Sequence, residues 1–91
     1  MEIKWIDRDP VTGEKRQLRA DRFAKQWRFA TRSRRGEQWQ RGLEPTLEIW
    51  EHVLDTLERR YRRRDGVSDE DVLQVKQLLD VFRQKIRESR P

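Results

Sequence analysis

Few side chains in this sequence have the type and spacing that catalysis or metal binding requires. A hydroxyl nucleophile needs a neighbouring base, and the one histidine that could serve as that base is His52. His52 lies two positions after Trp50 and so points away from the apolar stripe of the helix predicted there, where we expect an exposed residue without a catalytic role. One histidine and no cysteine also exclude a transition-metal site with two or three imidazole or thiolate ligands.

Paired carboxylates could serve as acid and base or hold a divalent cation. Asp7 with Asp9, and Asp65 with the run 69–71, are the close acidic groups, and neither has the alternating spacing of a calcium loop. A turn explains the first pair and a helix start explains the second. The glycine-rich motifs that bind nucleotide phosphates are missing as well. We therefore expect no enzymatic activity, no metal ion and no cofactor.

The first half of the chain combines basic and aromatic residues, as nucleic-acid-binding surfaces do. Residues 1–42 carry twelve Lys or Arg against six Asp or Glu, whereas residues 43–91 carry ten against eleven. Arginine outnumbers lysine by 17 to 5, which suits bidentate phosphate contacts and is also typical of a GC-rich, bacterial-like genome. Our candidates for a surface that contacts nucleic acid are Arg16, Arg19, Arg28, Arg32, Arg34 and Arg35.

Alternating residues in the first half predict short strands. Ile3 and Trp5 alternate with polar neighbours, and the segment 9–13 has turn chemistry before a second extended run over 16–20. A second hairpin is expected where the run 27–32 turns at Arg35 and Gly36 toward residues 38–40. The competing interpretation is a helix over 20–30, because apolar residues there also fit helical spacing, but we favour strands for 26–33.

If residues 26–33 form a strand, Arg28 and Arg32 project from one face while Trp27 and Phe29 project from the other. One face could then contact phosphates while the other packs in the core. We expect most Trp and Phe rings to be buried, since only 33% of residues are hydrophobic and the core needs their volume. The alternative is that exposed rings offer platforms on which bases stack.

The second half predicts two amphipathic helices, at about 45–63 and 69–88. Apolar residues recur at steps of three and four in both segments, at 47, 50, 54, 57 and 61 in the first and at 72, 75, 79, 82 and 86 in the second. Asp65-Gly66 supplies a residue that tolerates the left-handed conformation at a helix end, and Ser68 with Asp71 resembles a capping box. The loop between residues 63 and 69 is short enough to force the two helices into an antiparallel hairpin. Whether Glu44 or Thr46 caps the first helix stays open, with Pro45 suited to its first turn.

Together these elements predict a single α+β domain over residues 1–91. It consists of a small antiparallel sheet of three to four short strands in two hairpins, formed by the basic half 1–42, packed against a helical hairpin formed by 43–91. At 91 residues we expect one core. Apolar runs never exceed two residues, and the start of the chain does not resemble a secretory signal, so we expect a cytoplasmic protein that does not enter a membrane.

The function that this pattern favours is a non-enzymatic binding module whose basic face contacts phosphates of nucleic acid with little base specificity. The alternative is a protein-interaction module in which the helical hairpin binds an acidic partner or a second copy in a homodimeric four-helix bundle. A second basic cluster, residues 59–64, is explained by its place at the end of a helix and by acidic residues upstream at 51, 55 and 58.

Overall fold

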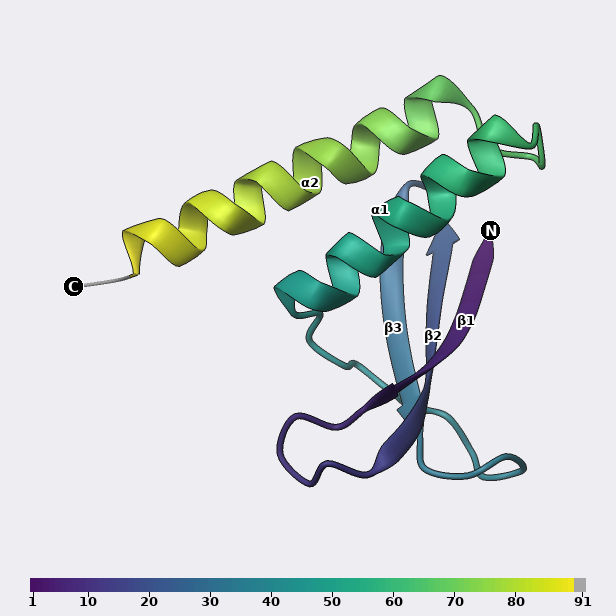
Figure 1. The fold of residues 1–91 in the computed structure, drawn as a ribbon, viewed down its shortest axis with the longest axis vertical. Helices are drawn as coiled ribbons and strands as arrows, with labels where there is room; N and C mark the ends of the chain where they lie inside the picture. Colours follow the sequence, from purple (N-terminus) through teal and green to yellow (C-terminus); the bar gives the residue numbers. More distant parts are fainter. Residues whose placement is uncertain (90–91) are drawn as a thin grey trace. The chain divides into compact units, whose positions relative to one another are not determined.

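The computed structural model describes residues 1–89, which divide along the chain into two compact units between Glu44 and Pro45. The first unit, Met1–Glu44, contains four strands, and the second contains two helices. Figure 1 labels the three longer strands and both helices. An antiparallel sheet followed by a helical hairpin confirms the predicted α+β fold class. The expectation that both halves share one core, as a single domain, stays a prediction.

The sheet is a meander in which each strand pairs antiparallel with the next along the chain. Its strands are β1 (Glu2–Arg8), β2 (Lys15–Phe23), β3 (Gln26–Arg32) and the two-residue β4 (Gln40–Arg41). The register pairs Trp5 with Leu18 and Leu18 with Thr31, with consecutive partners along both ladders. Because directly opposed residues project from the same face, this register decides which side chains share each face of the sheet.

The turn between β1 and β2 is built around Asp9. Its carboxylate accepts hydrogen bonds from the backbone N–H groups of Val11 and Thr12, at 2.8 and 3.4 Å, and its carbonyl accepts the N–H of Gly13 at 2.8 Å. These bonds form the side-chain-mediated turn that Asp favours. Gly13 has a φ of +74°, which glycine adopts without steric cost.

The structure decides between strand and helix for residues 20–30 in favour of the strands. β2 and β3 are joined by a two-residue turn, Ala24 and Lys25, with φ values of +50° and +63°. Positive φ at both central positions is the geometry of the type I′ hairpin turn, whose twist matches that of the strands. Neither residue is among those that favour this turn, so the hairpin forms without a turn signal in the sequence.

One face of the sheet carries most of the buried residues of the first unit. Ile3, Leu18, Ala20 and Phe29 project from it and are each at most 6% exposed. The buried Ala30 lies on the other face. The rings of Trp27 and Phe29, two residues apart on β3, stack with centroids 6.5 Å apart. The opposite face carries mostly exposed, charged side chains.

The two helices are α1 (Leu47–Arg62) and α2 (Asp69–Glu88), and they run antiparallel in a hairpin (Figure 1). Thr46 caps α1, its hydroxyl accepting the N–H of Ile49 at 3.3 Å, which decides between the two candidate caps. Ser68 caps the N-terminus of α2 with the predicted capping box. α1 therefore starts two residues later and ends one residue earlier than expected, while the bounds of α2 agree.

The C-terminus of α1 differs from the expectation that Gly66 provides the left-handed residue next to the helix. Arg64, with a φ of +56°, takes that position. The N–H of Asp65 donates to the carbonyl of Arg60 at 2.9 Å, and the N–H of Arg64 donates to the carbonyl of Tyr61 at 3.0 Å. These two hydrogen bonds form a Schellman motif. Gly66, with a φ of +73°, serves the following turn instead.

The buried face of α1 is wider than the predicted stripe. Ile49 and Val53 are buried in addition to Trp50 and Leu57, while Tyr61, expected at the end of the stripe, is exposed. On α2 the buried residues are Val75 and Leu79, with the rest of the predicted stripe half-buried. The helices are also joined by an ion pair between Arg83 and Glu51, with nitrogen and oxygen 3.6 Å apart.

Candidate nucleic-acid interface

Three of the six candidate arginines lie on one face of the sheet. In the register, Arg28 is opposite Asp21 and Ala30 is opposite Arg19, and Arg32 is two residues further along β3. Arg19, Arg28 and Arg32 therefore project together, on the face opposite to Trp27 and Phe29, as the strand pattern predicts.

The same face carries basic residues that were not among the candidates. We call it the basic face and define it by its seven cationic side chains: Lys4, Arg8, Lys15, Arg19, Arg28, Arg32 and Arg41. Only two acidic side chains, Glu2 and Asp21, project from these strands on this side. Extending the alternation to the first strands would have placed Lys4 and Arg8 here from the sequence. Arg41 depends on the pairing of the short β4, which the sequence does not specify.

Arg16 lies on the other face, away from the group. Its Nε is 2.7 Å from Oδ1 of Asp7 and its Nη2 is 3.2 Å from Oδ2, so the two side chains form a bidentate pair across β1 and β2. The side chain of Arg16 is only 13% exposed. Hydrogen bonding to Asp7 raises the pKa of Arg16 above its ordinary value. This arginine is neutralised within the sheet, and its position indicates a structural role.

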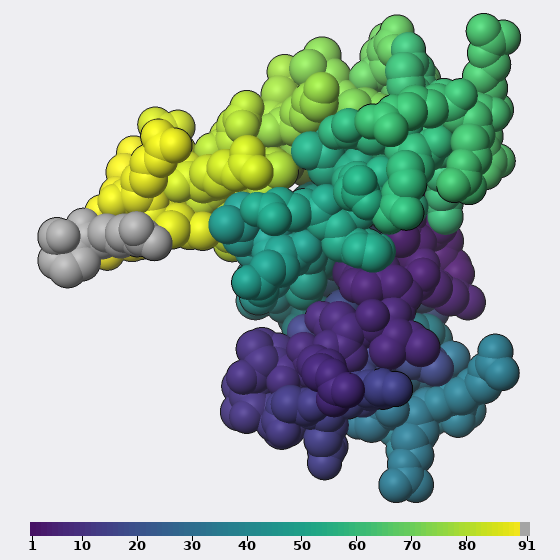
Figure 2. All heavy atoms as spheres, in the orientation of Figure 1, coloured from purple at the N-terminus to yellow at the C-terminus, as the bar shows by residue number. Residues whose placement is uncertain are grey.

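Arg34 and Arg35 lie in the exposed loop between β3 and β4. A turn closes there, with the N–H of Glu37 bonding the carbonyl of Arg34 at 3.2 Å, and Gly36 takes a φ of +91°. Figure 2 shows long side chains of this segment, in blue, projecting from the surface of the first unit. Within residues 1–89 no salt bridge involves Arg28, Arg34, Arg35 or Arg41. Their charges are therefore available to a ligand.

The centre of the basic face is a cluster of two arginines and a tryptophan. The guanidinium carbons of Arg32 and Arg19 lie 4.2 and 4.9 Å from the centroid of the Trp39 ring. Nε of Arg32 donates to Oε1 of Gln17 at 2.6 Å, and its Nη1 donates to the carbonyl of Glu37 at 3.3 Å. Nε of Arg19 is 2.9 Å from a carboxylate oxygen of Asp21. These contacts hold Trp39 on the sheet, half-buried, and they fix the direction of both guanidiniums.

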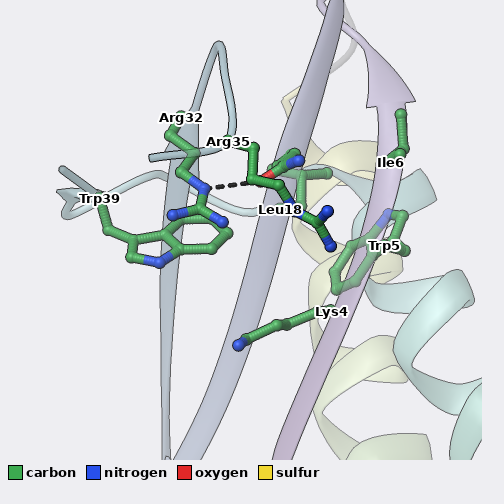
Figure 3. A pocket seen from close by; sticks show the side chains of 8 residues that line it. Lys4, Trp5, Ile6, Leu18, Arg32, Arg35 and Trp39 are labelled. Carbon is green, nitrogen blue, oxygen red and sulfur yellow. Dashed lines mark hydrogen bonds between the residues drawn. The ribbon is translucent and has the colours of Figure 1, made fainter. Parts of the chain in front are cut away.

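An open pocket of about 440 Å³ adjoins this cluster. Figure 3 shows the side chains that line it, together with the hydrogen bond from Arg32 to Gln17. Three strands and the loop after β3 contribute to the lining: Lys4, Trp5, Ile6, Gln17, Leu18, Arg32, Arg35 and Trp39. Three of these side chains are cationic and none is acidic, so the pocket has the charge to bind an anion.

The expectation that most Trp and Phe rings are buried is wrong. Phe29 and Trp50 are buried, but Trp5, Trp27, Trp39 and Phe82 are half-buried and Phe23 is 82% exposed. Phe23 is opposite Gln26 and so lies on the basic face, at the end next to the type I′ turn. Aromatic rings are therefore present beside the cations, as the stacking alternative requires.

His52 is half-buried and has an interaction within the protein, in contrast to the exposed histidine expected from its helical position. In the part of the chain that the structure describes, no three His, Cys, Asp or Glu side chains gather as a metal site would need. None of the helices within residues 1–89 has the length and apolar content to cross a membrane.

Comparison with models of known protein families, with curated proteins and with solved structures finds no match for this chain.

Proposed function

We propose that this protein is a non-enzymatic, cytoplasmic module that binds nucleic acid through the basic face of its sheet. The observation that carries the proposal is the segregation of charge: seven cationic side chains project from one face, against two acidic ones. The first unit as a whole has twelve Lys or Arg against seven Asp or Glu, and the second unit has ten of each. Positive charge is thus concentrated on the unit, and on the face, that would contact phosphates.

The state of the individual arginines supports this proposal. On the opposite face, Arg16 has a carboxylate partner in Asp7. Arg28 and Arg41 on the strands, with Arg35 in the adjoining loop, have none within residues 1–89. Like charges held close together repel, and a polyanion removes that repulsion while releasing its counterions. Contacts to the phosphate backbone carry little sequence information, so base specificity should be low.

Fluorescence anisotropy with labelled single- and double-stranded oligonucleotides tests this function. Binding should be measurable at about 50 mM salt and should weaken by a factor of about ten or more at about 200 mM, because each phosphate contact releases counterions. The double variant Arg28→Ala, Arg41→Ala should lower the affinity and reduce the salt dependence by about one to two counterions.

The matched control removes the same charge from exposed positions of α2, as Lys76→Ala with Arg87→Ala. This control should leave the affinity close to that of the wild type. If both double variants lower it equally, net charge and not the basic face determines binding. If the wild type binds neither oligonucleotide at low salt, the proposed function is wrong.

A second candidate function is supported by exposed apolar residues on α2. Leu73, Leu78 and Val81 are between 38 and 54% exposed, and Leu78 and Val81 lie on neighbouring positions of the helix surface. A dimerisation module would bury them in a four-helix bundle. Sedimentation should then show a mass that rises with concentration and falls in the variant Leu78→Glu, Val81→Glu. A monomer at every concentration would exclude this function.

A further inference from the structure

The pocket beside Trp39 combines two kinds of surface. Lys4, Arg32 and Arg35 supply positive charge, while Trp39 and Ile6 supply apolar area, Ile6 being 64% exposed. Figure 3 shows these side chains around one common space. The volume of about 440 Å³ is within the range of sites for small ligands. A ligand that satisfies both surfaces must have an anionic group next to a flat, apolar one.

Arg32 is positioned in advance for such a ligand. Two of the five N–H groups of its guanidinium are used by Gln17 and by the carbonyl of Glu37, and its plane is held near the ring of Trp39. The remaining N–H groups can donate to an anion. Because the side chain is already held in place, less conformational entropy is lost on binding. Lys4, which pairs with Glu2 at 3.0 Å, and the exposed Arg35 extend the positive charge across the pocket.

Trp39 adds an aromatic surface, which a site for phosphate alone does not need. A half-buried indole at the edge of a pocket can stack with a planar base, and stacking of this kind requires a base that is not already stacked within a duplex. Its contacts with Arg19 and Arg32 hold the ring in place on the sheet. The phosphate and the base of one unpaired nucleotide match the charge and the aromatic surface of the pocket.

Resting on the proposed function, we propose that this pocket binds one unpaired nucleotide of a single-stranded nucleic acid. The base stacks on Trp39, and the phosphate is held by Arg32, Arg35 and Lys4. The rest of the basic face contacts neighbouring phosphates in single strands and in duplexes alike. The pocket thereby gives the protein a preference for single strands over duplex.

The test compares single-stranded and duplex oligonucleotides of equal length on the wild type and on Trp39→Leu. The wild type should bind the single strand more tightly by about 5- to 150-fold, the contribution of one stacked base, and Trp39→Leu should lose this preference while keeping duplex affinity. The matched control is Phe23→Leu, which changes an exposed aromatic residue of the same face outside the pocket. It should keep the preference.

Competition with small ligands gives a second measurement that needs no variant. A mononucleotide should displace the labelled single strand at lower concentration than inorganic phosphate does, because only the nucleotide has a base to stack. In NMR spectra each of the four tryptophans gives one indole N–H signal. The signal of Trp39 is identified because it is missing from the spectrum of Trp39→Phe. Addition of the mononucleotide should shift this signal. Arg35→Ala, a change at an exposed loop residue, should weaken nucleotide binding without unfolding the sheet.

The outcomes separate this inference from the function on which it rests. Equal binding of single strand and duplex, unchanged in Trp39→Leu, would overturn the nucleotide pocket and leave the phosphate-binding face in place. Equal displacement by phosphate and mononucleotide would overturn it as well. Absence of binding to either oligonucleotide would instead reject the proposed function itself.

Discussion

The guanidinium of Arg32 lies over the indole of Trp39, with 4.2 Å between the guanidinium carbon and the ring centroid. Trp39 is in the irregular segment after β3, and Arg32 is the last residue of that strand. Because Arg32 also donates to the side chain of Gln17 on β2, the contact ties the loop to two strands of the sheet. The same arginine thus stabilises the loop and faces the pocket.

This relationship predicts an energetic coupling between Arg32 and Trp39. A double-mutant cycle with Arg32→Ala and Trp39→Ala should give a coupling free energy of about 0.5–2 kcal/mol, as expected for a cation–π pair that is partly desolvated. Urea denaturation of the wild type, both single variants and the double variant measures it. Strict additivity of the two single changes would show that the contact contributes nothing to stability.

The ion pair of Arg16 and Asp7 predicts a different effect for an arginine that was a candidate for ligand binding. Arg16→Ala should lower the free energy of unfolding by about 1.5–3 kcal/mol, because it removes two charge-assisted hydrogen bonds and leaves Asp7 without its partner. It should leave oligonucleotide affinity nearly unchanged. The matched change Arg28→Ala, on an exposed and unpaired arginine, should show the reverse pattern. A loss of affinity in Arg16→Ala at unchanged stability would contradict this assignment.

The strands and the division of their residues between two faces could be predicted because alternation is a local property of the sequence. Arg28 and Arg32 were placed correctly relative to Trp27 and Phe29 by counting residues. Counting could not show which arginines are neutralised. That distinction depends on Asp7 and Arg16 facing each other across two strands, and thus on a register that the turn at Asp9 determines.

Two backbone features were beyond prediction for a related reason. Ala24-Lys25 and Arg64 adopt left-handed conformations that residues other than Gly, Asn and Asp rarely occupy, so residue type gave no signal. The surrounding hydrogen bonds of the hairpin and of the Schellman motif impose these conformations. The cluster around Trp39 was also missed, because it joins β2, β3 and a loop through side chains alone.

The left-handed Arg64 at the end of α1 predicts a stabilising substitution. Arg64→Gly should raise the free energy of unfolding by about 0.5–1 kcal/mol, since glycine adopts positive φ without the steric cost that other residues incur. Arg63→Gly is the matched control: it removes the same charge from the neighbouring residue, whose φ is −84°, and should not stabilise the protein. Urea denaturation followed by circular dichroism compares them. Equal stabilisation by both would indicate relief of charge repulsion in place of backbone strain.

The turn at Asp9 predicts a loss of stability in acid. Hydrogen bonds from the backbone N–H groups of Val11 and Thr12 hold the pKa of the Asp9 carboxyl below its ordinary value of 3.8. A carboxyl whose pKa is lower in the folded than in the unfolded state stabilises the fold above the unfolded pKa. This contribution should therefore disappear as the pH falls from about 4 through the lower, folded-state pKa. Carbon NMR titration of the Asp9 carboxyl measures that pKa directly.

Two variants separate the charge of Asp9 from its place in the turn. Asp9→Asn retains an oxygen that can accept from Val11 and Thr12 but does not titrate, so its free energy of unfolding should depend less on pH below about 4 than that of the wild type. Asp9→Ala removes the acceptor and should destabilise the turn at every pH. A titration midpoint of Asp9 at or above the ordinary value would show that the backbone hydrogen bonds do not favour the charged form, and the predicted difference between wild type and Asp9→Asn in acid would then vanish.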